Sequence, residues 1–196
     1  MSGAALRGGV LVLAAVALAA PPRPAAGRAE GPEPGFSGGF GEPTCTACHF
    51  DAPAEPEAGG LLLEGVPERY APGEAYTLRL TLRDPGLERA GFQLAVRFAD
   101  GEEAGRQAGG VAGEGRGAEI VEHGEPPVLY ARQTSEGSRP LASHETTWTL
   151  RWTAPAAGGG PVIFHAAANA GNDDDSELGD VVHTTSATST GGVAPR

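Results

Sequence analysis

The sequence predicts an all-β protein that folds as an antiparallel β-sandwich, and three observations lead to this expectation. From about residue 60 to residue 185, short apolar runs alternate with turns rich in glycine and proline. Several of these runs alternate apolar and polar residues with the period of two that is typical of strands. No segment shows a helical period of useful length, and about 125 residues suffice for one sandwich with its own core.

The first half of this region contains the clearest predicted strand. A short apolar run at residues 61–66 comes first. Residues 74–83 then place a tyrosine and three leucines on one face and threonine or arginine on the other. An Asp-Pro-Gly turn ends this strand. The alternation returns at residues 91–98, so a second amphipathic strand is expected there.

The second half adds five predicted strands. Two weaker ones cover residues 118–122 and 128–132. Residues 147–152 place two tryptophans and a leucine on one face, which predicts a core-facing strand. Residues 161–168 form a nearly continuous apolar run, as expected of a central strand. A short run at residues 181–185 completes the predicted sandwich.

A Cys-x-x-Cys-His sequence at residues 45–49 is the motif that carries chemistry. This spacing is the attachment signature of a c-type haem. Cys45 and Cys48 lie on one short turn, so each can form a thioether with one vinyl group of the same porphyrin. His49 then follows as the proximal iron ligand. The motif therefore predicts one covalent haem c held by Cys45, Cys48 and His49.

Two other uses of the cysteines remain open. They are the only two cysteines in the chain, and in an oxidising compartment they can close a small disulfide. A structural zinc site would need four ligands, and no second Cys/His pair with matching spacing is present.

The ligand on the far side of the iron is a separate question. Met1 is the only methionine, and it would leave with the signal peptide described below, so a histidine–methionine site is excluded. His165 is the tentative distal ligand, because it lies in the strongest apolar strand, opposite Phe164 and near the small Ala167. His183 is the runner-up, and a five-coordinate iron is the remaining alternative.

Residues 1–19 are predicted to be a secretory signal peptide. Arg7 supplies the positive start, an apolar run too short to span a bilayer follows, and Ala-Leu-Ala at residues 17–19 offers a cleavage site. No other stretch is long and apolar enough to cross a membrane, so the mature chain is expected to have no integral membrane segment. The protein is expected in the periplasm, outside the cell or at its surface.

Composition divides the remaining chain into four parts. Residues 20–41 are rich in Pro, Gly and Ala and are predicted to be a mobile linker. Residues 42–58 form the haem-attachment segment, and residues 59–185 form the sandwich. Residues 186–196 are rich in Ser, Thr and Gly and are predicted to be a disordered tail.

The chain is acidic, which bears on its partners. Its formal net charge of −11 becomes −12 once Arg7 leaves with the signal peptide. Nucleic acids and anionic lipid surfaces would repel such a protein, whereas a basic redox partner is compatible with it. The densest acidic stretch, residues 172–177, could bind calcium, although its spacing is not that of an EF-hand and its surroundings are typical of a solvated turn.

Four segments resemble a known family. Residues 65–76 (Gly-Val-Pro-Glu-Arg-Tyr-Ala-Pro-Gly-Glu-Ala-Tyr) resemble the opening of the bacterial choice-of-anchor V domain, and residues 90–94, 148–155 and 160–170 fit the same pattern. That domain is similar to the reeler (reelin-type) β-sandwich, and its members commonly carry a CxxCH just ahead of the sandwich. The resemblance spans roughly residues 42–185 and implies an immunoglobulin-like, reeler-like antiparallel β-sandwich in an exported bacterial protein. Members commonly have a His-Thr pair near residue 133, where this chain has Gln133 and Thr134.

The sequence thus favours an exported monohaem c-type cytochrome that passes single electrons to a redox partner protein. No spacing singles out a catalytic nucleophile or acid–base pair, so an electron carrier is favoured over an enzyme. The alternative is a cell-surface adhesion or scaffold module, in which the haem or a Cys45–Cys48 disulfide is only structural. A haem sensor or peroxidase would require an open iron position. The fold resemblance by itself does not decide among them.

Overall fold

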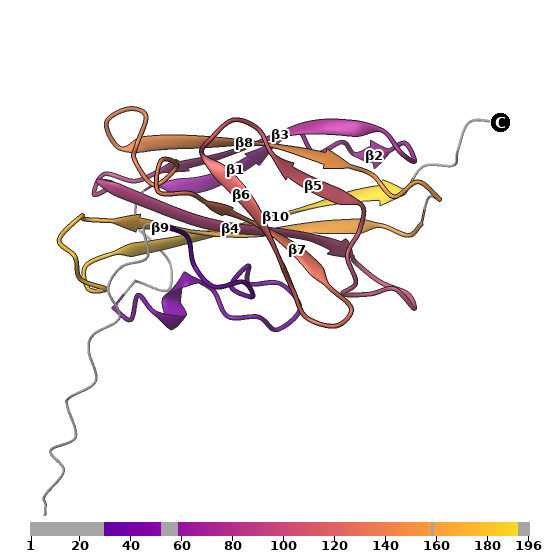
Figure 1. Ribbon diagram of the computed structural model, residues 1–196, viewed down its shortest axis with the longest axis horizontal. Helices are drawn as coiled ribbons and strands as arrows, with labels where there is room; N and C mark the ends of the chain where they lie inside the picture. The colour runs from indigo at the N-terminus through magenta and orange to yellow at the C-terminus, as the bar shows by residue number, and fades with distance from the viewer. Residues whose placement is uncertain (1–29, 52–58, 158, 192–196) are drawn as a thin grey trace, which may run out of the picture.

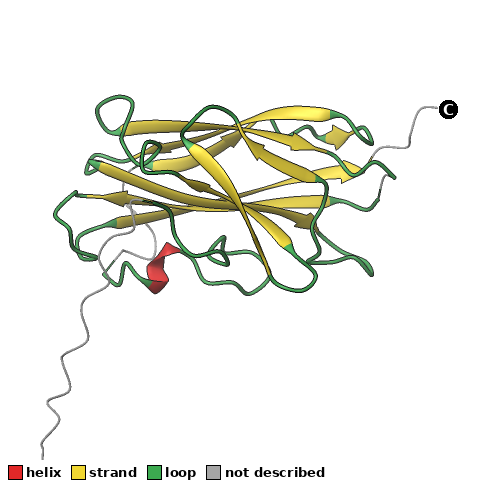
Figure 2. Ribbon diagram, viewed as in Figure 1, coloured by secondary structure: helices red, strands yellow, loops and turns green. Residues whose placement is uncertain are grey.

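The structure is a computed structural model that describes residues 30–51, 59–157 and 159–191. Two β-sheets stack face to face in it, and loops join their strands (Figure 1). The described residues contain ten strands and one short 3-10 turn, η1 (Cys45–Ala47), which lies outside the two layers (Figure 2). The predicted antiparallel β-sandwich is therefore confirmed.

The smaller sheet has four strands in the order β1-β3-β8-β5, and every neighbouring pair is antiparallel. The pair β3 and β8 forms its centre, with nine residues in each strand. The strand bounds are β1 (Gly60–Glu64), β3 (Ala75–Arg83), β5 (Gly110–Gly113) and β8 (Glu145–Thr153).

The larger sheet has six strands in the order β2-β10-β9-β4-β7-β6. All neighbours are antiparallel except the short β2, which runs parallel to β10. The bounds are β2 (Arg69–Tyr70), β4 (Arg89–Phe98), β6 (Ala118–His123), β7 (Val128–Gln133), β9 (Val162–Gly171) and β10 (Val181–Gly191). All eight predicted strands are present; β2 and β5 were not predicted, because neither has enough residues to show an alternation.

The core lies between the two sheets and is built from the faces that the period-two pattern selected. Leu78, Leu80 and Leu82 of β3 are fully buried, as the alternation predicted. Trp152 lies in the middle of an aromatic cluster, with its ring edge-on to Phe164 and Tyr70 and stacked with Tyr76. Its indole N–H donates to the backbone carbonyl of Ala108 at 2.9 Å, so this large side chain is buried without an unpaired donor.

The predicted disordered tail is wrong for residues 186–191. Strand β10 continues to Gly191, and its pairing with β9 extends to Ser189 opposite Val162. Ser189 is fully buried. A Ser/Thr/Gly composition suggested disorder, but the neighbouring strand supplies hydrogen bonds to the backbone, and threonine is well suited to a strand. Residues 192–196 lie outside the described residues.

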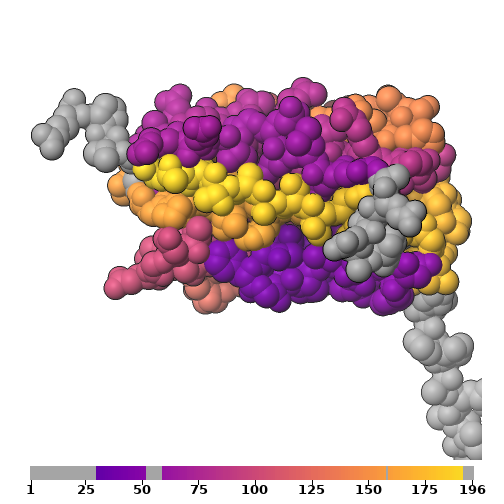
Figure 3. All heavy atoms as spheres, turned by 180° about the vertical axis from the view of Figure 1, so that it is seen from behind, coloured from indigo at the N-terminus to yellow at the C-terminus, as the bar shows by residue number. Residues whose placement is uncertain are grey.

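The predicted mobile linker is also wrong for the part that the structure describes. Residues 30–41, together with residues 42–51, lie along the outer face of the six-stranded sheet; we call residues 30–51 the N-terminal segment (Figure 1). From behind, it runs below the yellow strand β10 (Figure 3). At Gly31 a side chain could not fit, because its Cβ would lie 2.7 Å from the carbonyl oxygen of Gln133. Gly31 therefore allows the segment to pack closely against β7.

The structure does not describe all of the predicted N-terminal regions of the chain. The predicted signal peptide at residues 1–19, the linker residues 20–29 and residues 52–58 of the haem-attachment segment lie outside the described residues. Within the described part of the chain, no helix is long and apolar enough to cross a membrane.

Candidate functional site

A cleft of about 320 Å³ lies between the N-terminal segment and the outer face of the six-stranded sheet. All three residues of the predicted attachment site, Cys45, Cys48 and His49, line it. The sheet contributes small residues, including Gly91 of β4 and Gly171 of β9. The loop between β9 and β10 adds acidic residues: Asp173, Asp174, Asp175 and Glu177.

The turn η1 places the two thiols beside the imidazole. Its start is capped by Thr44, whose hydroxyl accepts from the backbone N–H of Thr46 at 3.3 Å. The backbone N–H groups of Cys48 and His49 then both donate to the carbonyl of Cys45, at 3.1 and 3.0 Å. This tight turn presents Cys45, Cys48 and His49 to one cavity. A porphyrin joined through two adjacent thioethers requires that arrangement.

The two cysteines are free thiols in the structure, and their surroundings differ. Cys48 is exposed, whereas Cys45 is partly covered. Burial raises the pKa of the Cys45 thiol to about 12, and the nearby Cys48 adds to the rise, while a backbone hydrogen bond opposes it. Cys45 is therefore a protonated thiol at neutral pH, unlike a thiolate that binds zinc or attacks a substrate.

His49 contacts a buried carboxylate. Its Nδ1 lies 2.5 Å from Oδ2 of Asp180, whose side chain is only 4% exposed. The alignment of this contact is poor for a hydrogen bond, so Nδ1 has no partner of good geometry. Within the described residues no hydrogen bond engages Nε2, so this nitrogen is available to a ligand in the cleft.

Asp180 is itself held by two other groups. The side-chain amide of Asn169 donates to its Oδ2 at 3.0 Å, and the backbone N–H of Asn172 donates to its Oδ1 at 3.2 Å. Burial by itself raises the pKa of Asp180, but His49 and these two donors outweigh burial and hold the pKa below its ordinary value. The carboxylate is therefore ionised at neutral pH.

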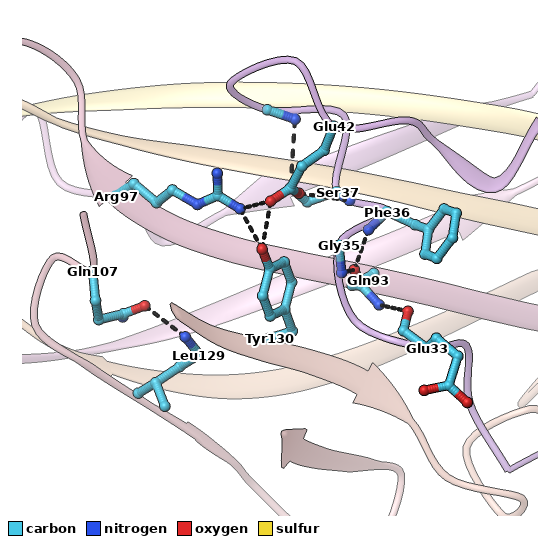
Figure 4. A network of polar contacts seen from close by, with 11 residues as sticks. Glu33, Gly35, Phe36, Ser37, Glu42, Gln93, Arg97, Gln107, Leu129 and Tyr130 are labelled. Carbon is cyan, nitrogen blue, oxygen red and sulfur yellow. Dashed lines mark hydrogen bonds and ion pairs between the residues drawn. The ribbon is translucent and has the colours of Figure 1, made fainter. Parts of the chain in front are cut away.

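The N-terminal segment is anchored farther along by a second buried carboxylate, Glu42 (Figure 4). Its side chain contacts the guanidinium of Arg97 and the hydroxyl of Tyr130, and it accepts from the hydroxyl of Ser37 at 2.6 Å. Arg97 lies on β4 and Tyr130 on β7, so Glu42 joins the segment to two strands. Phe40 covers the cluster, with the Arg97 guanidinium 5.4 Å from the centre of its ring.

A single glutamine provides a third attachment point (Figure 4). The Oε1 of Gln93 accepts from the backbone N–H groups of Gly35 and Phe36 at 2.8 and 2.5 Å, and its Nε2 donates to the carbonyl of Glu33 at 2.9 Å. Gln93 is fully buried. It therefore gives the N-terminal segment the backbone hydrogen bonds that a neighbouring strand would otherwise supply.

The Glu42 cluster makes stability depend on pH. Burial by itself raises the pKa of Glu42, but Ser37, Tyr130 and Arg97 outweigh it and lower the pKa below its ordinary value of 4.5. A carboxylate with a lowered folded-state pKa stabilises the fold fully above its unfolded pKa. That stability is lost as pH falls through the folded pKa. We expect the free energy of unfolding to fall on acidification below about pH 4.5.

Urea unfolding between pH 7 and pH 3 measures this dependence. Glu42→Gln should flatten the acidic part of the curve, since glutamine does not titrate. Glu103→Gln, which removes an exposed carboxylate paired with Arg106 at the surface, should leave it nearly unchanged. Equal curves for the wild type and Glu42→Gln would contradict the assignment.

The structure does not bring His165 to the cleft. Its ring lies against Gly39, where a Cβ would come within 2.5 Å of its Nδ1, and edge-on to Phe40 at 5.7 Å between ring centres. His165 and Asn169 both lie on β9, four residues apart, which is roughly 13 Å along the strand. His49 contacts Asp180, and Asp180 in turn accepts from Asn169, so His49 lies near the Asn169 end of this stretch. Burial and the charge of Arg97 lower the pKa of His165, although Glu42 opposes them. In this arrangement His165 is part of the anchoring cluster and does not line the cleft that contains His49.

His183, the runner-up distal ligand, is engaged elsewhere. Its Nε2 lies 2.8 Å from Oδ2 of Asp84, and both side chains are almost completely buried. Its cross-strand partner is Ala168, a core residue. Because directly opposite residues project to the same face of a sheet, His183 points between the two sheets, away from the cleft.

The acidic loop gives no support to a calcium site. One of its carboxylates, Asp173, pairs with Arg89 at 2.7 Å, and Asp174 accepts hydrogen bonds from Asn172 and Ser176. Among the residues that the structure describes, no group of three or more His, Cys, Asp or Glu side chains is arranged to hold a metal ion. The loop instead forms an acidic rim on one side of the cleft.

Asp180, Asn169 and Gln93 were not singled out from the sequence. In the sequence Asp180 resembles the other acidic residues of the loop before it, and no sequence pattern near it connects it to His49. Gln133 was noted only as a departure from a resemblance, yet it lines the same cleft and accepts from the backbone N–H of Phe92 at 2.8 Å. A polar residue within an apolar strand, such as Asn169, was the one available signal.

Comparison with known proteins adds only structural similarity. No protein family model and no curated protein matches the chain. The human F-spondin reeler domain is similar at 21% identity with a TM-score of 0.43, over 67% of this chain and 89% of that one. A second structure, the Reelin-N domain of F-spondin, has 20% identity and a TM-score of 0.45, over 69% and 86%. A cohesin module from Clostridium perfringens has 13% identity and a TM-score of 0.44, over 67% and 95%. These similarities extend no further than a reeler-like β-sandwich.

Proposed function

We propose that this protein is an exported monohaem c-type cytochrome that transfers single electrons. The observation that carries the proposal is the meeting of Cys45, Cys48 and His49 on one wall of the cleft. When bound, the haem would supply an iron that alternates between the ferric and ferrous states by one electron. We further infer that the chain is related to the choice-of-anchor V domains.

The residues of the cleft fit such a group. Two thiols and an imidazole lie on one tight turn, and the sheet side of the cleft is lined by the small residues Gly91 and Gly171. The free Nε2 of His49 is the atom that would bind iron, since Nδ1 faces Asp180. Phe36, which lines the cleft, gives it apolar surface against a flat macrocycle.

For a haem bound in the cleft, the described residues would offer no second histidine as an iron ligand. Besides His49, no histidine or methionine of the described residues lines the cleft. Gln133 and Arg89 are polar residues that do line it. We therefore expect the sixth position to be open to water or a small ligand. The His165 ligation suggested by the sequence would require Gly39 and Phe40 of the N-terminal segment to move from their place over His165.

The acidic rim suggests how a partner would dock. Asp173, Asp174, Asp175 and Glu177 border the cleft, and the whole chain has a net charge of −11. A redox partner with a basic surface would be drawn to this side by long-range attraction. We place this encounter in the periplasm or at the cell exterior, where c-type haem is attached and used.

A second candidate function is a cell-surface adhesion or scaffold module. The observation that favours it is the anchoring of the N-terminal segment to the sheet through the side chains of Glu42 and Gln93. Haem, or a disulfide between Cys45 and Cys48, would then be a structural accessory.

The deciding experiment is the intact mass and pyridine haemochrome spectrum of the full chain exported together with a c-type maturation system. We expect one added haem mass that survives denaturation, and reversible reduction with a soluble donor. Adding carbon monoxide to the ferrous sample should change its spectrum if the sixth position is open. Colourless protein with only its polypeptide mass would overturn the cytochrome proposal. Haem that exchanges no electrons with donors would favour the scaffold module.

A further inference from the structure

The contact between His49 and Asp180 unites two parts of the chain that have no local relation. Asp180 directly precedes β10, whereas His49 follows the turn η1 in the N-terminal segment. The carboxylate is 4% exposed and the imidazole side chain 22% exposed, so both are largely removed from water. Asn169 and the backbone of Asn172 fix the carboxylate from its other sides.

We propose that Asp180 is the positioning residue of the proximal histidine, which holds the imidazole proton on Nδ1 of His49 and lowers the reduction potential of the iron bound at Nε2. This inference rests on the proposed function. The established chemistry of haem attachment involves only the two thiols and the histidine, and it does not specify what the other ring nitrogen meets. Here the structure places the buried carboxylate of Asp180 2.5 Å from that nitrogen.

The contact with Asp180 bears on which ring nitrogen of His49 carries the proton. A neutral imidazole carries one proton, and the group that accepts from one nitrogen decides which nitrogen carries it. The carboxylate oxygen 2.5 Å from Nδ1 attracts the positive end of an N–H, so its charge favours the proton there although the contact is poorly aligned for a hydrogen bond. The lone pair of Nε2 is then directed to the cleft, as a metal-binding histidine requires.

The charge of Asp180 bears on the reduction potential of an iron bound at Nε2 of His49. Reduction adds one electron to ferric iron and gives ferrous iron, so it removes one positive charge from the site. A buried carboxylate stabilises the more positive ferric state, and its contact with Nδ1 makes the imidazole a stronger electron donor. Both effects oppose reduction, so removing the charge should raise the potential.

The test compares two variants that each remove one negative charge from the cleft. Asp180→Asn keeps the size and an acceptor oxygen of the side chain but loses the charge beside His49. Asp175→Asn removes a charge from the exposed rim, where water and salt screen it. We expect Asp180→Asn to shift the ferric–ferrous equilibrium at least tenfold toward ferrous, which is about 59 mV for one electron. Asp175→Asn should shift it much less, and Asp180→Glu should restore a potential near that of the wild type.

A second readout needs no haem. Nitrogen-15 NMR of histidine-labelled, haem-free protein at about pH 8, where a histidine is ordinarily neutral, reports which ring nitrogen of His49 is protonated. We expect the Nδ1–H tautomer in the wild type and a shift toward Nε2–H in Asp180→Ala. This measurement decides the role of Asp180 even if Asp180→Asn fails to accept haem.

The outcomes separate the two proposals. Wild-type protein that acquires no haem overturns the cytochrome function and the effect on potential, while the tautomer still tests the contact. Haem-loaded wild type with equal potentials for Asp180→Asn and Asp175→Asn overturns the role of Asp180 and leaves the cytochrome function intact. An Nε2–H tautomer in the haem-free wild type also overturns that role.

Discussion

Protein that carries both Cys45→Ser and Cys48→Ser is expected to contain no covalently attached haem. A hydroxyl does not form the thioether that a thiol forms with a porphyrin vinyl group, and these are the only two cysteines in the chain. Intact mass after denaturation measures the result, and the expected loss is complete. Each single variant retains one possible thioether, so it should keep a reduced fraction of haem.

Two control variants distinguish the loss of the thioether bonds from a general disturbance of the turn. Ala47→Ser changes the same exposed turn but leaves both thiols, so it should bind haem like the wild type. His49→Ala should retain some covalent haem with an altered visible spectrum, because the thioethers remain while the proximal bond is lost. A full haem mass on the double cysteine variant would contradict the assignment of the attachment site.

Replacing Arg97 with alanine is expected to release the N-terminal segment from the sheet. Arg97 is 6% exposed and contacts Glu42, whose side chain is 16% exposed. Without the guanidinium, the Glu42 carboxylate loses its counter-charge in a nearly buried position, which costs about 3–5 kcal/mol. Because Glu42 lies three residues before Cys45, we expect the variant also to lower the yield of the proposed covalent haem.

Urea unfolding and amide hydrogen exchange measure this effect. We expect a lower free energy of unfolding and faster exchange at residues 35–42 than in the wild type. The matched control is Arg106→Ala, which breaks an ion pair with Glu103 in which both side chains are 53% exposed. Exposed pairs contribute only about 0–1 kcal/mol, so equal losses in the two variants would contradict the buried role of Arg97.

The sequence by itself determined eight of the ten described strands, and it contains the Cys-x-x-Cys-His motif. Leu78, Leu80 and Leu82 alternate with polar residues, and this local period selects the face that β3 buries. The motif at residues 45–49 is equally local, because its chemistry depends only on the spacing of neighbouring residues. Such features are predictable, since nearest neighbours along the chain decide them.

Only the tertiary structure decided which surfaces meet. The strand order places β9 between β10 and β4, so Asn169 and Asp180 come together beneath His49. Composition suggested mobility for residues 30–41 and disorder for residues 186–191, yet Gln93 and strand β9 satisfy their backbone groups. His165 was expected at the iron, but Gly39 and Phe40 cover it. These outcomes depend on hydrogen bonds and packing between residues far apart in the chain, and local periodicity contains no information about such partners.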